Sequence, residues 1–217
     1  MAQTTTGLHS ILSSSTIYRL SQSLMGGRAG RTAFARDYVR ATPGANVMDV
    51  GCGPADILDY LPRTISYWGF DISPRYIAHA RARHGDRGRF FAKELETSDL
   101  ALLPPIDVVI ATGLFHHLDD STAERLLDLI HCALKPGGRL VTLDGVFDPS
   151  QNPIARWLIS MDRGQHVRTE SQYQALFSKV FDSPRLAIRH RTWIPYTHCL
   201  AECTRSVVDQ KPRDSAL

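Results

Sequence analysis

The sequence predicts an α/β fold built on an open, mostly parallel β-sheet, and three observations lead to that prediction. A short apolar strand at residues 46–50 runs into Gly51 and Gly53, and a helical pattern follows at residues 57–61. A strand, a glycine turn and a helix begin the nucleotide-binding half of such a sheet, because glycine lets a ligand lie against bare backbone. A second apolar strand at residues 67–70 ends in Asp71, and residues 107–111 form a Val- and Ile-rich run typical of a central parallel strand.

The charged residues around the glycine turn indicate which ligand binds. Asp71 follows Gly51 by 20 residues, the spacing at which a carboxylate accepts hydrogen bonds from both ribose hydroxyls. Asp49 ends the first strand with a negative charge, which suits a cation and not a phosphate. Asp56 stands three residues after Gly53, where a dinucleotide fingerprint needs a small residue, and its charge would repel a pyrophosphate. A ligand with a ribose, a positive charge and no phosphate is predicted. S-adenosylmethionine has these features, whereas both acids argue against a nicotinamide oxidoreductase.

Four segments, in this order and at this spacing, resemble the class I S-adenosylmethionine-dependent methyltransferases: residues 47–53, 69–73, 107–118 and 134–140. The resemblance covers roughly residues 40–145 closely. It implies a Rossmann-like, seven-stranded, mostly parallel sheet with one antiparallel strand near the edge and helices on both faces. Ala55 stands where the family usually has a third glycine. Because alanine adds only a methyl group, we expect a slightly tighter loop and no loss of binding.

The chain divides into an N-terminal helical cap, residues 1–40, and a methyltransferase domain, residues 41–217, which together form a single compact domain. Two helical patterns, at residues 10–25 and 28–40, are separated by Gly26 and Gly27. In the resembling family such helices lie across the cofactor and shape the substrate pocket. The resemblance therefore makes Tyr18 a candidate contact to the methionine end, although simple packing explains it equally well.

The resemblance extends the cofactor site to the third and fourth strands. Residues 89–92 form the predicted third strand, and in the family an acid just after it meets the adenine amino group, a role that falls to Glu94 while Leu95 packs on the ring. Thr112 and Gly113 leave the fourth strand opposite the glycine turn, where open sheets bind ligands. The predicted cofactor-binding residues are Tyr18, Asp49, Gly51, Cys52, Gly53, Asp71, Ile72, Glu94, Leu95, Thr112 and Gly113.

The last third of the chain completes the sheet. The fifth strand is predicted at residues 139–143, ending in Asp144. Residues 145–170 are expected to be a long, irregular part of the substrate pocket, since long loops in compact domains are often functional. Thr169 and Gln172 form a capping box before a helix. Residues 185–193 and 196–204 are predicted as an antiparallel pair at the sheet's edge.

Methyl transfer from a sulfonium is a direct displacement, so the enzyme mainly aligns the acceptor and excludes water. A general base is needed only if the acceptor must lose a proton. His116, His117 and Asp144 are the candidates, because they follow the fourth and fifth strands and histidine titrates near neutral pH. In the resembling family the residue at His117 is the more usual one and ties the loop down. Asp144 otherwise caps a loop.

The acceptor is predicted to be a small molecule methylated on O, N or C. Residues 111–115 lack the Asn/Asp-Pro-Pro-aromatic run of enzymes that methylate adenine or glutamine amino groups. Phe115, Trp157 and Tyr173 hint at an apolar or planar acceptor. Two alternatives stay open: an RNA or protein methyltransferase, and a cyclase or other cofactor-binding protein that keeps the fold without methylating.

Composition sets the remaining bounds. The net charge of +3 does not call for nucleic acid or an anionic membrane. The four cysteines lack the spacing of zinc ligands or of a disulfide framework, so we expect no metal and reduced thiols in a cytoplasmic protein. The sequence has no run of 18 apolar residues, so no membrane span is expected. The oligomeric state cannot be predicted.

Overall fold

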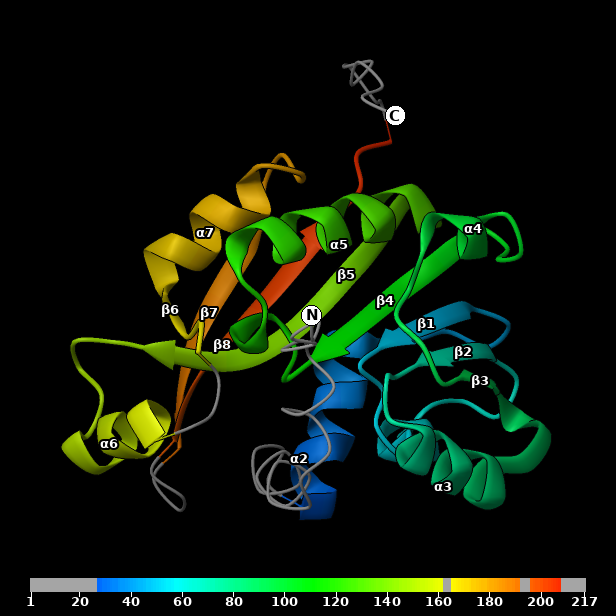
Figure 1. The fold of residues 1–217 in the computed structure, drawn as a ribbon, viewed down its shortest axis with the longest axis horizontal. Coiled ribbons are helices and arrows are strands. Elements are labelled where there is room, and N and C mark those ends of the chain that lie inside the picture. Colours follow the sequence, from blue (N-terminus) through cyan, green and yellow to red (C-terminus); the bar gives the residue numbers. More distant parts are fainter. Residues whose placement is uncertain (1–26, 162–164, 192–195, 208–217) are drawn as a thin grey trace, which may run out of the picture.

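The computed structural model describes residues 27–161, 165–191 and 196–207. Its centre is a twisted sheet whose strands follow the order β3-β2-β1-β4-β5-β8-β7, with the short β6 paired to β5 outside that path (Figure 1). The neighbours from β3 to β5 are parallel, whereas β8 runs antiparallel to both β5 and β7. The predicted seven-stranded, mostly parallel sheet with one antiparallel strand near its edge is thus confirmed, and β6 adds an eighth strand. The strands are β1 Asn46–Val50, β2 Ser66–Phe70, β3 Arg89–Phe91, β4 Ile106–Thr112, β5 Leu134–Phe147, β6 Arg168–Thr169, β7 Arg185–Arg191 and β8 Tyr196–Thr204.

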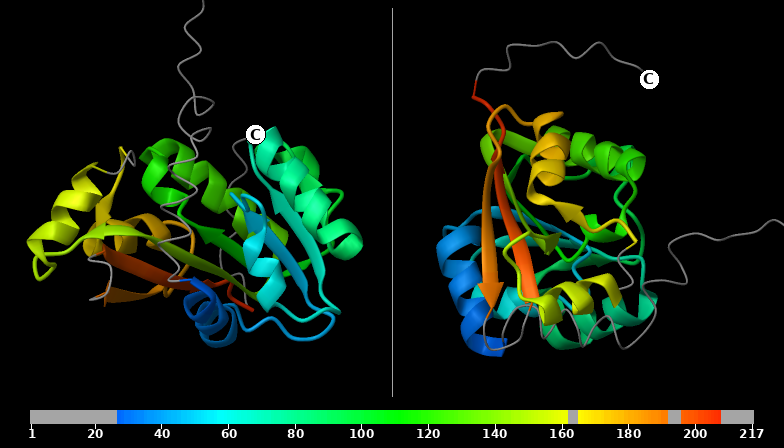
Figure 2. Two further views of the ribbon diagram at one scale, coloured as in Figure 1. Left: turned by 90° about the horizontal axis from the view of Figure 1, so that it is seen from below. Right: turned by 90° about the vertical axis from the view of Figure 1, so that its left-hand side faces the viewer.

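Helices cover both faces of the sheet (Figures 1 and 2). Successive strand residues point to opposite faces, so Met48 and Val50 join a core under α5 and α7, while Val47 joins a second core with α2, η3 and α3. The α5 stripe that includes Leu127 and Ile130 is fully buried. The helical elements are α2 Gly27–Phe34, η2 Ala35–Val39, η3 Asp56–Tyr60, α3 Pro74–His84, η4 Gly85–Arg87, α4 Thr97–Leu100, η5 Phe115–His117, α5 Asp120–Ala133, α6 Pro153–Met161 and α7 Glu170–Ser178.

Three local expectations were wrong. The helix after the glycine turn is a single 3-10 segment, η3, because Ala55 before it adopts a left-handed conformation (φ 57°) and Pro62 follows closely. The fifth strand continues past Asp144 to Phe147. The segment 145–170 is not irregular: it contains α6, whose first turn Asn152 caps by accepting from the Ile154 N–H at 2.8 Å, with Pro153 at the first helical position.

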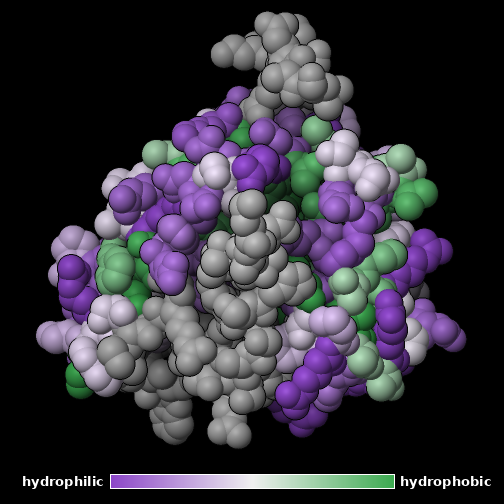
Figure 3. All heavy atoms as spheres, viewed as in Figure 1, coloured by the Kyte–Doolittle hydropathy of each residue, from purple (hydrophilic) through white to green (hydrophobic). Residues whose placement is uncertain are grey.

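The part of the predicted N-terminal cap that the structure describes is α2 with η2. It packs on the face that carries Val47, and Arg139 of β5 donates to the carbonyl oxygens of Tyr38 and Val39. Residues 1–26, Tyr18 among them, lie outside the described residues, so the cap and its cofactor contact stay predictions. Figure 3 shows mostly hydrophilic side chains on the described part of one face. No described helix is long and apolar enough to cross a membrane.

Candidate cofactor and active site

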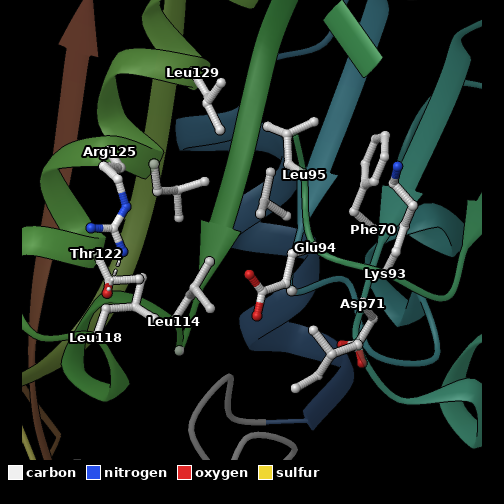
Figure 4. Close-up of a pocket in the computed structure, with 15 residues that line it drawn as sticks. Phe70, Asp71, Lys93, Glu94, Leu95, Leu114, Leu118, Thr122, Arg125 and Leu129 are labelled. Atoms are coloured by element: carbon white, nitrogen blue, oxygen red, sulfur yellow. Dashed lines mark hydrogen bonds between the residues drawn. The ribbon is translucent and has the colours of Figure 1, made fainter. Parts of the chain in front are cut away.

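A cavity opens at the carboxyl ends of β1, β2 and β4, where open sheets bind ligands. One wall comes from the end of β2 and the segment after β3, and the other comes from the segment after β4 and the first half of α5 (Figure 4). Leucines form most of the second wall. The side chains of Lys93, on the first wall, and Arg125, on the second, stand at the rim of the cavity. The lining residues are Val50, Gly51, Phe70, Asp71, Ile72, Lys93, Glu94, Leu95, Gly113, Leu114, Leu118, Thr122, Arg125, Leu126 and Leu129.

The glycine turn forms one end of this cavity. Gly51 (φ 73°) and Gly53 (φ 53°) both adopt left-handed conformations that favour glycine. The turn is attached to β2, because the N–H groups of Gly51 and Cys52 both donate to the Phe70 carbonyl, at 2.8 and 3.0 Å. A Cβ added at Gly53 would meet no atom within 4 Å, so the backbone there is open to a ligand.

Asp71 is held rigidly where β2 ends. Its Oδ2 accepts from the Gly53 N–H at 2.9 Å, and its Oδ1 accepts from the Ser73 N–H at 2.8 Å. Burial raises the pKa of this carboxyl, and the two backbone N–H groups oppose that rise. Because a carboxylate oxygen has two lone pairs, each oxygen keeps one acceptor position for a ligand hydroxyl.

Asp49 lies beneath the glycine turn and does not line the cavity. Its Oδ2 accepts from the Tyr67 hydroxyl at 2.6 Å, whereas its Oδ1, also buried, has no hydrogen-bond partner among the described residues. Burial raises the pKa of Asp49 to about 7; the Tyr67 hydrogen bond opposes this rise and the Asp71 charge adds to it. The sequence predicted a cofactor contact here, or else hydrogen bonds to the amides of the turn. The structure pairs Asp49 with a tyrosine and not with those amides, and the cofactor contact stays a prediction.

The three catalytic candidates meet at the ends of β4 and β5. His116 Nδ1 lies 2.9 Å from Asp144 Oδ1, and both side chains are buried. Because an ionised carboxylate only accepts hydrogen bonds, Nδ1 is the donor of this pair. The His117 ring stacks at a tilt on the His116 ring, with centroids 4.0 Å apart. His116 and Asp144 are thus a pair, and His117 is their neighbour.

The pair is close to the cavity, although its members do not line it. A Cβ added at Gly113, a lining residue, would lie 3.8 Å from His116 Cε1. Buried Arg168 holds the intervening segment by donating to the carbonyl oxygens of Phe115, at 2.7 Å, and Leu118, at 2.8 Å. The Gly113 N–H also donates to the Leu143 carbonyl at 2.9 Å. A fixed segment therefore joins the cavity to the His116–Asp144 pair.

The predicted cofactor residues divide into three groups. Six line the cavity, and four lie beside it in or below the same loops; only Tyr18 falls outside the described residues. The lining six are Gly51, Asp71, Ile72, Glu94, Leu95 and Gly113, and the other four are Asp49, Cys52, Gly53 and Thr112. No group of three or more potential metal ligands occurs within the described ranges.

Several residues of the site were missed. Leu114, Leu118, Arg125 and Leu126 line the cavity but were not predicted to do so. The helical spacing of Arg125 and Leu126 on α5 was the available signal, but the same spacing describes ordinary packing. The hint of an aromatic acceptor pocket was wrong for two residues, because Phe115 and Tyr173 are fully buried in the core.

Fold and cavity together define an open-sheet protein with a ribose-compatible acid at the end of β2. The family model described as a methyltransferase domain matches residues 48–140. An O-methyltransferase of Pyrenophora dematioidea is 28% identical over 155 residues, covering 64% of this chain and 57% of the relative. Acetylserotonin O-methyltransferase of Mus musculus is 29% identical over 186 residues, covering 77% and 45%. The chain thus spans about half the length of these curated relatives.

Solved structures show the same fold. The Haemonchus contortus phosphoethanolamine N-methyltransferase 2, in complex with S-adenosyl-L-methionine, matches with a TM-score of 0.65 at 16% identity, covering 88% of this chain and 56% of that one. The Burkholderia thailandensis 1,6-didemethyltoxoflavin-N1-methyltransferase, with bound 1,6-didemethyltoxoflavin and S-adenosylhomocysteine, matches with a TM-score of 0.63 at 19% identity, covering 87% and 81%. Residues 48–140 thus form a methyltransferase domain of the class I, S-adenosylmethionine-dependent type.

Proposed function

We propose that this chain transfers a methyl group from S-adenosylmethionine to a small-molecule acceptor. The observation that carries the proposal is the cavity in which Asp71, Glu94 and Leu95 face the glycine turn, within the segment that matches the methyltransferase family. The relatives named above, an O-methyltransferase, acetylserotonin O-methyltransferase and a toxoflavin-precursor N-methyltransferase, support a small acceptor.

The residues present fit this cofactor. Both oxygens of Asp71 keep a lone pair for a ribose hydroxyl, and Leu95 with Leu114 supplies apolar surface for adenine. Glu94 lies beside Leu95 and would accept from the adenine amino group. The unpartnered Asp49 Oδ1 supplies a negative charge below the turn, which suits the cationic methionine end. We assign Cys52, Gly53 and Thr112 to the backbone surface around the same ligand, with Ile72 against the ribose.

The bound cofactor would supply a methyl group already activated by its positive sulfur. The chain's own residues would orient the acceptor, exclude water and manage the acceptor proton. Asp144 accepts the Nδ1–H of His116, which makes Nε2 the basic nitrogen that takes a proton from a hydroxyl acceptor. Asp144 then stabilises the resulting imidazolium. His117, stacked on His116, restricts the orientation of that ring.

The first test is calorimetric titration with S-adenosylmethionine, S-adenosylhomocysteine and NAD. We expect wild type to bind the first two and not NAD. Asp71→Ala should weaken both by about 100-fold, because two hydrogen bonds to a charged acceptor are lost at about 1.5 kcal/mol each. Asp86→Ala, a change at an exposed aspartate in η4, is the matched control and should bind like wild type. A folded wild-type protein that binds neither ligand would contradict the proposal.

The second test identifies the acceptor class. The protein is incubated with methyl-labelled cofactor and, in separate reactions, a panel of small hydroxyl and amine compounds, total RNA and a protein mixture. We expect label only in the small-molecule reactions. Label in RNA or protein would favour the corresponding alternative. Tight cofactor binding with no transfer to any acceptor would favour a binding protein on the same fold.

A further inference from the structure

Tyr67 occupies a slot that the backbone leaves open for its ring. A Cβ on Gly88 would lie 2.9 Å from Tyr67 Cδ1, and a Cβ on Gly69 would lie 3.1 Å from Tyr67 Cε1. The first contact is too short to form and the second is tighter than most real contacts, so a side chain at either position would press on the ring. Phe90 packs against it at a centroid distance of 5.8 Å. The ring is fully buried, and its position delivers the hydroxyl to Asp49.

Asp49 and Tyr67 are paired through the register of the sheet. Tyr67 lies opposite Val47 in the parallel β1–β2 pair, and both side chains face the core that α2, η3 and α3 cover. Asp49, two residues after Val47, points to the same face. The 2.6 Å hydrogen bond uses Oδ2 and leaves Oδ1 buried without a partner among the described residues. A carboxylate buried in this way either takes up a proton or stays ionised beside a compensating positive charge.

We infer that Tyr67 is a positioning residue: its hydroxyl holds Asp49 Oδ2, leaves Oδ1 for the cationic end of the cofactor, and favours the ionised carboxylate that binding requires. The inference rests on the proposed function and deepens it, because it names the residue that controls the charge of the cofactor site. A neutral, protonated Asp49 would lose its attraction for the sulfonium and ammonium groups. Binding of the cationic cofactor therefore strengthens as the pH rises through neutrality.

The other ionisable groups around the pair do not replace this control. Burial raises the pKa of the Cys52 thiol and of the Tyr67 hydroxyl well above their usual values, so both stay neutral. Asp71 disfavours the ionised form of Asp49 by repulsion. Asp56 of η3 is paired with Arg31 of α2, at 3.3 Å, and with Arg83 of α3. Among the described residues, the hydroxyl of Tyr67 is thus the group that stabilises the Asp49 charge.

The test is a pH series of calorimetric titrations between pH 6 and 8.5 with S-adenosylmethionine and the uncharged-sulfur product S-adenosylhomocysteine. For wild type we expect affinity for the cationic ligand to rise with a midpoint near pH 7, more steeply than affinity for the product. Tyr67→Phe keeps the ring in its slot and should move the midpoint up by about one pH unit, since a hydrogen bond to a charged group is worth about that much. The loss is then about fivefold at pH 7, approaches tenfold at pH 6 and shrinks toward pH 8.5.

Two further variants complete the design. Tyr60→Phe, a half-buried tyrosine of η3 whose hydroxyl makes no hydrogen bond to the described residues, should keep the wild-type profile. Asp49→Asn should bind S-adenosylmethionine weakly at every pH and abolish the difference between the two ligands. The amino group of the ligand also titrates near pH 8, but this affects the titrations of wild type and all variants equally.

The outcomes separate the inference from the proposed function. Wild type that binds with no pH dependence, or Tyr67→Phe that weakens binding by one factor at all pH values, would reduce Tyr67 to a packing residue and overturn the inference while the proposed function stands. Failure of folded wild type to bind either ligand at any pH would overturn the proposed function first. Circular dichroism and a thermal melt of Tyr67→Phe exclude misfolding as the cause of a loss.

Discussion

Two buried aspartates lie near the carboxyl ends of strands in this sheet, and their partners differ in kind. Asp49 of β1 accepts from a tyrosine hydroxyl at 2.6 Å, whereas Asp144 of β5 lies 2.9 Å from a histidine nitrogen. Each keeps one buried oxygen without a partner among the described residues, Oδ1 in Asp49 and Oδ2 in Asp144. Similar burial and similar bonding therefore surround two carboxylates whose neighbours can carry very different charges.

That difference indicates how the two halves of the site divide their work. Tyr67 stays neutral because burial raises its pKa well above the usual value, so it cannot neutralise Asp49. A cationic ligand can neutralise Asp49. The partner of Asp144 is an imidazole, which as a base can accept a proton from an acceptor hydroxyl. We interpret the β1–β2 half as the part that binds a positive charge and the β4–β5 half as the part that holds a proton.

The largest expected effect comes from the proton-holding half. For a hydroxyl acceptor found in the labelling screen, His116→Ala should lower the turnover rate by about 10³-fold, the size typical of a lost general base. Asp144→Asn should lower it by a smaller but similar factor. Cofactor affinity should stay within about threefold of wild type, because His116 and Asp144 belong to the β4–β5 half of the site, whereas Asp71 and the glycine turn belong to the β1–β2 half.

Single-turnover transfer of the labelled methyl group, with cofactor affinity measured separately, checks this prediction. His79→Ala on the exposed face of α3 is the matched control. Equal rates for His116→Ala and the control would show that the acceptor needs no base on this chain. A loss of cofactor affinity as large as the loss of rate would contradict the assignment of cofactor binding and proton transfer to separate halves of the site.

Much of the binding half could be predicted, because its signals are local. The roles of Gly51 and Gly53, and of an acid where an apolar strand ends, can be predicted from the few residues around each of them. The β5–β8–β7 region also followed from strand patterns, as the antiparallel pair shows. The prediction failed for α6, since the Asn152–Pro153 start signal stands inside a mixed segment that reads as a loop.

Side-chain contacts that depend on the register between strands could not be predicted. Tyr67 reads as one more apolar residue of a buried strand, and only the register that places it opposite Val47 brings its hydroxyl to Asp49. His116 and Asp144 were separate candidates for the same reason: 28 residues separate them, and they meet only because β4 and β5 are parallel neighbours. Side-chain pairs that depend on strand register can be identified only once the structure of the sheet is known.

The free energy of unfolding, measured against pH, tests whether Asp49 of the β1–β2 half lacks a compensating charge in the free protein. The pKa of Asp49 is raised from 3.8 to about 7 in the folded protein, so the wild type loses stability as the pH rises from about 4 to about 7. Asp49→Asn carries no such penalty. Without ligand it should therefore match wild type near pH 4 and exceed it by about 2 kcal/mol at pH 8, less than the full shift implies because buried sites relax and admit water.

Urea unfolding of the ligand-free proteins at several pH values tests this expectation. Asp86→Asn, at an exposed site, should differ from wild type by the same small amount throughout. Parallel curves for Asp49→Asn and wild type would mean that Asp49 is already neutralised in the free protein. In that case the two aspartates would not differ as described, and the binding half would not depend on a cationic ligand for its charge balance.

The smallest effect is expected at Ala55, a buried residue that follows the glycine turn. Its left-handed conformation (φ 57°) costs about 1 kcal/mol for alanine, and a glycine would avoid that cost. The methyl group is fully buried, however, and removing it loses about 0.8 kcal/mol, while glycine adds about 0.5 kcal/mol of unfolded-state entropy. Ala55→Gly should therefore lower the free energy of unfolding by less than 1 kcal/mol.

Cofactor affinity should stay within about twofold in this variant, because the N–H groups of Gly51, Cys52 and Gly53 keep their partners on β2 and Asp71. Urea unfolding and calorimetry measure the two quantities on the same sample. A gain of stability above about 1 kcal/mol would show that strain at Ala55 outweighs its packing. A large loss of affinity would show that the turn depends on this methyl group to hold Asp49 and Asp71 in place. The charge of Asp49 would then be coupled to the position of Asp71.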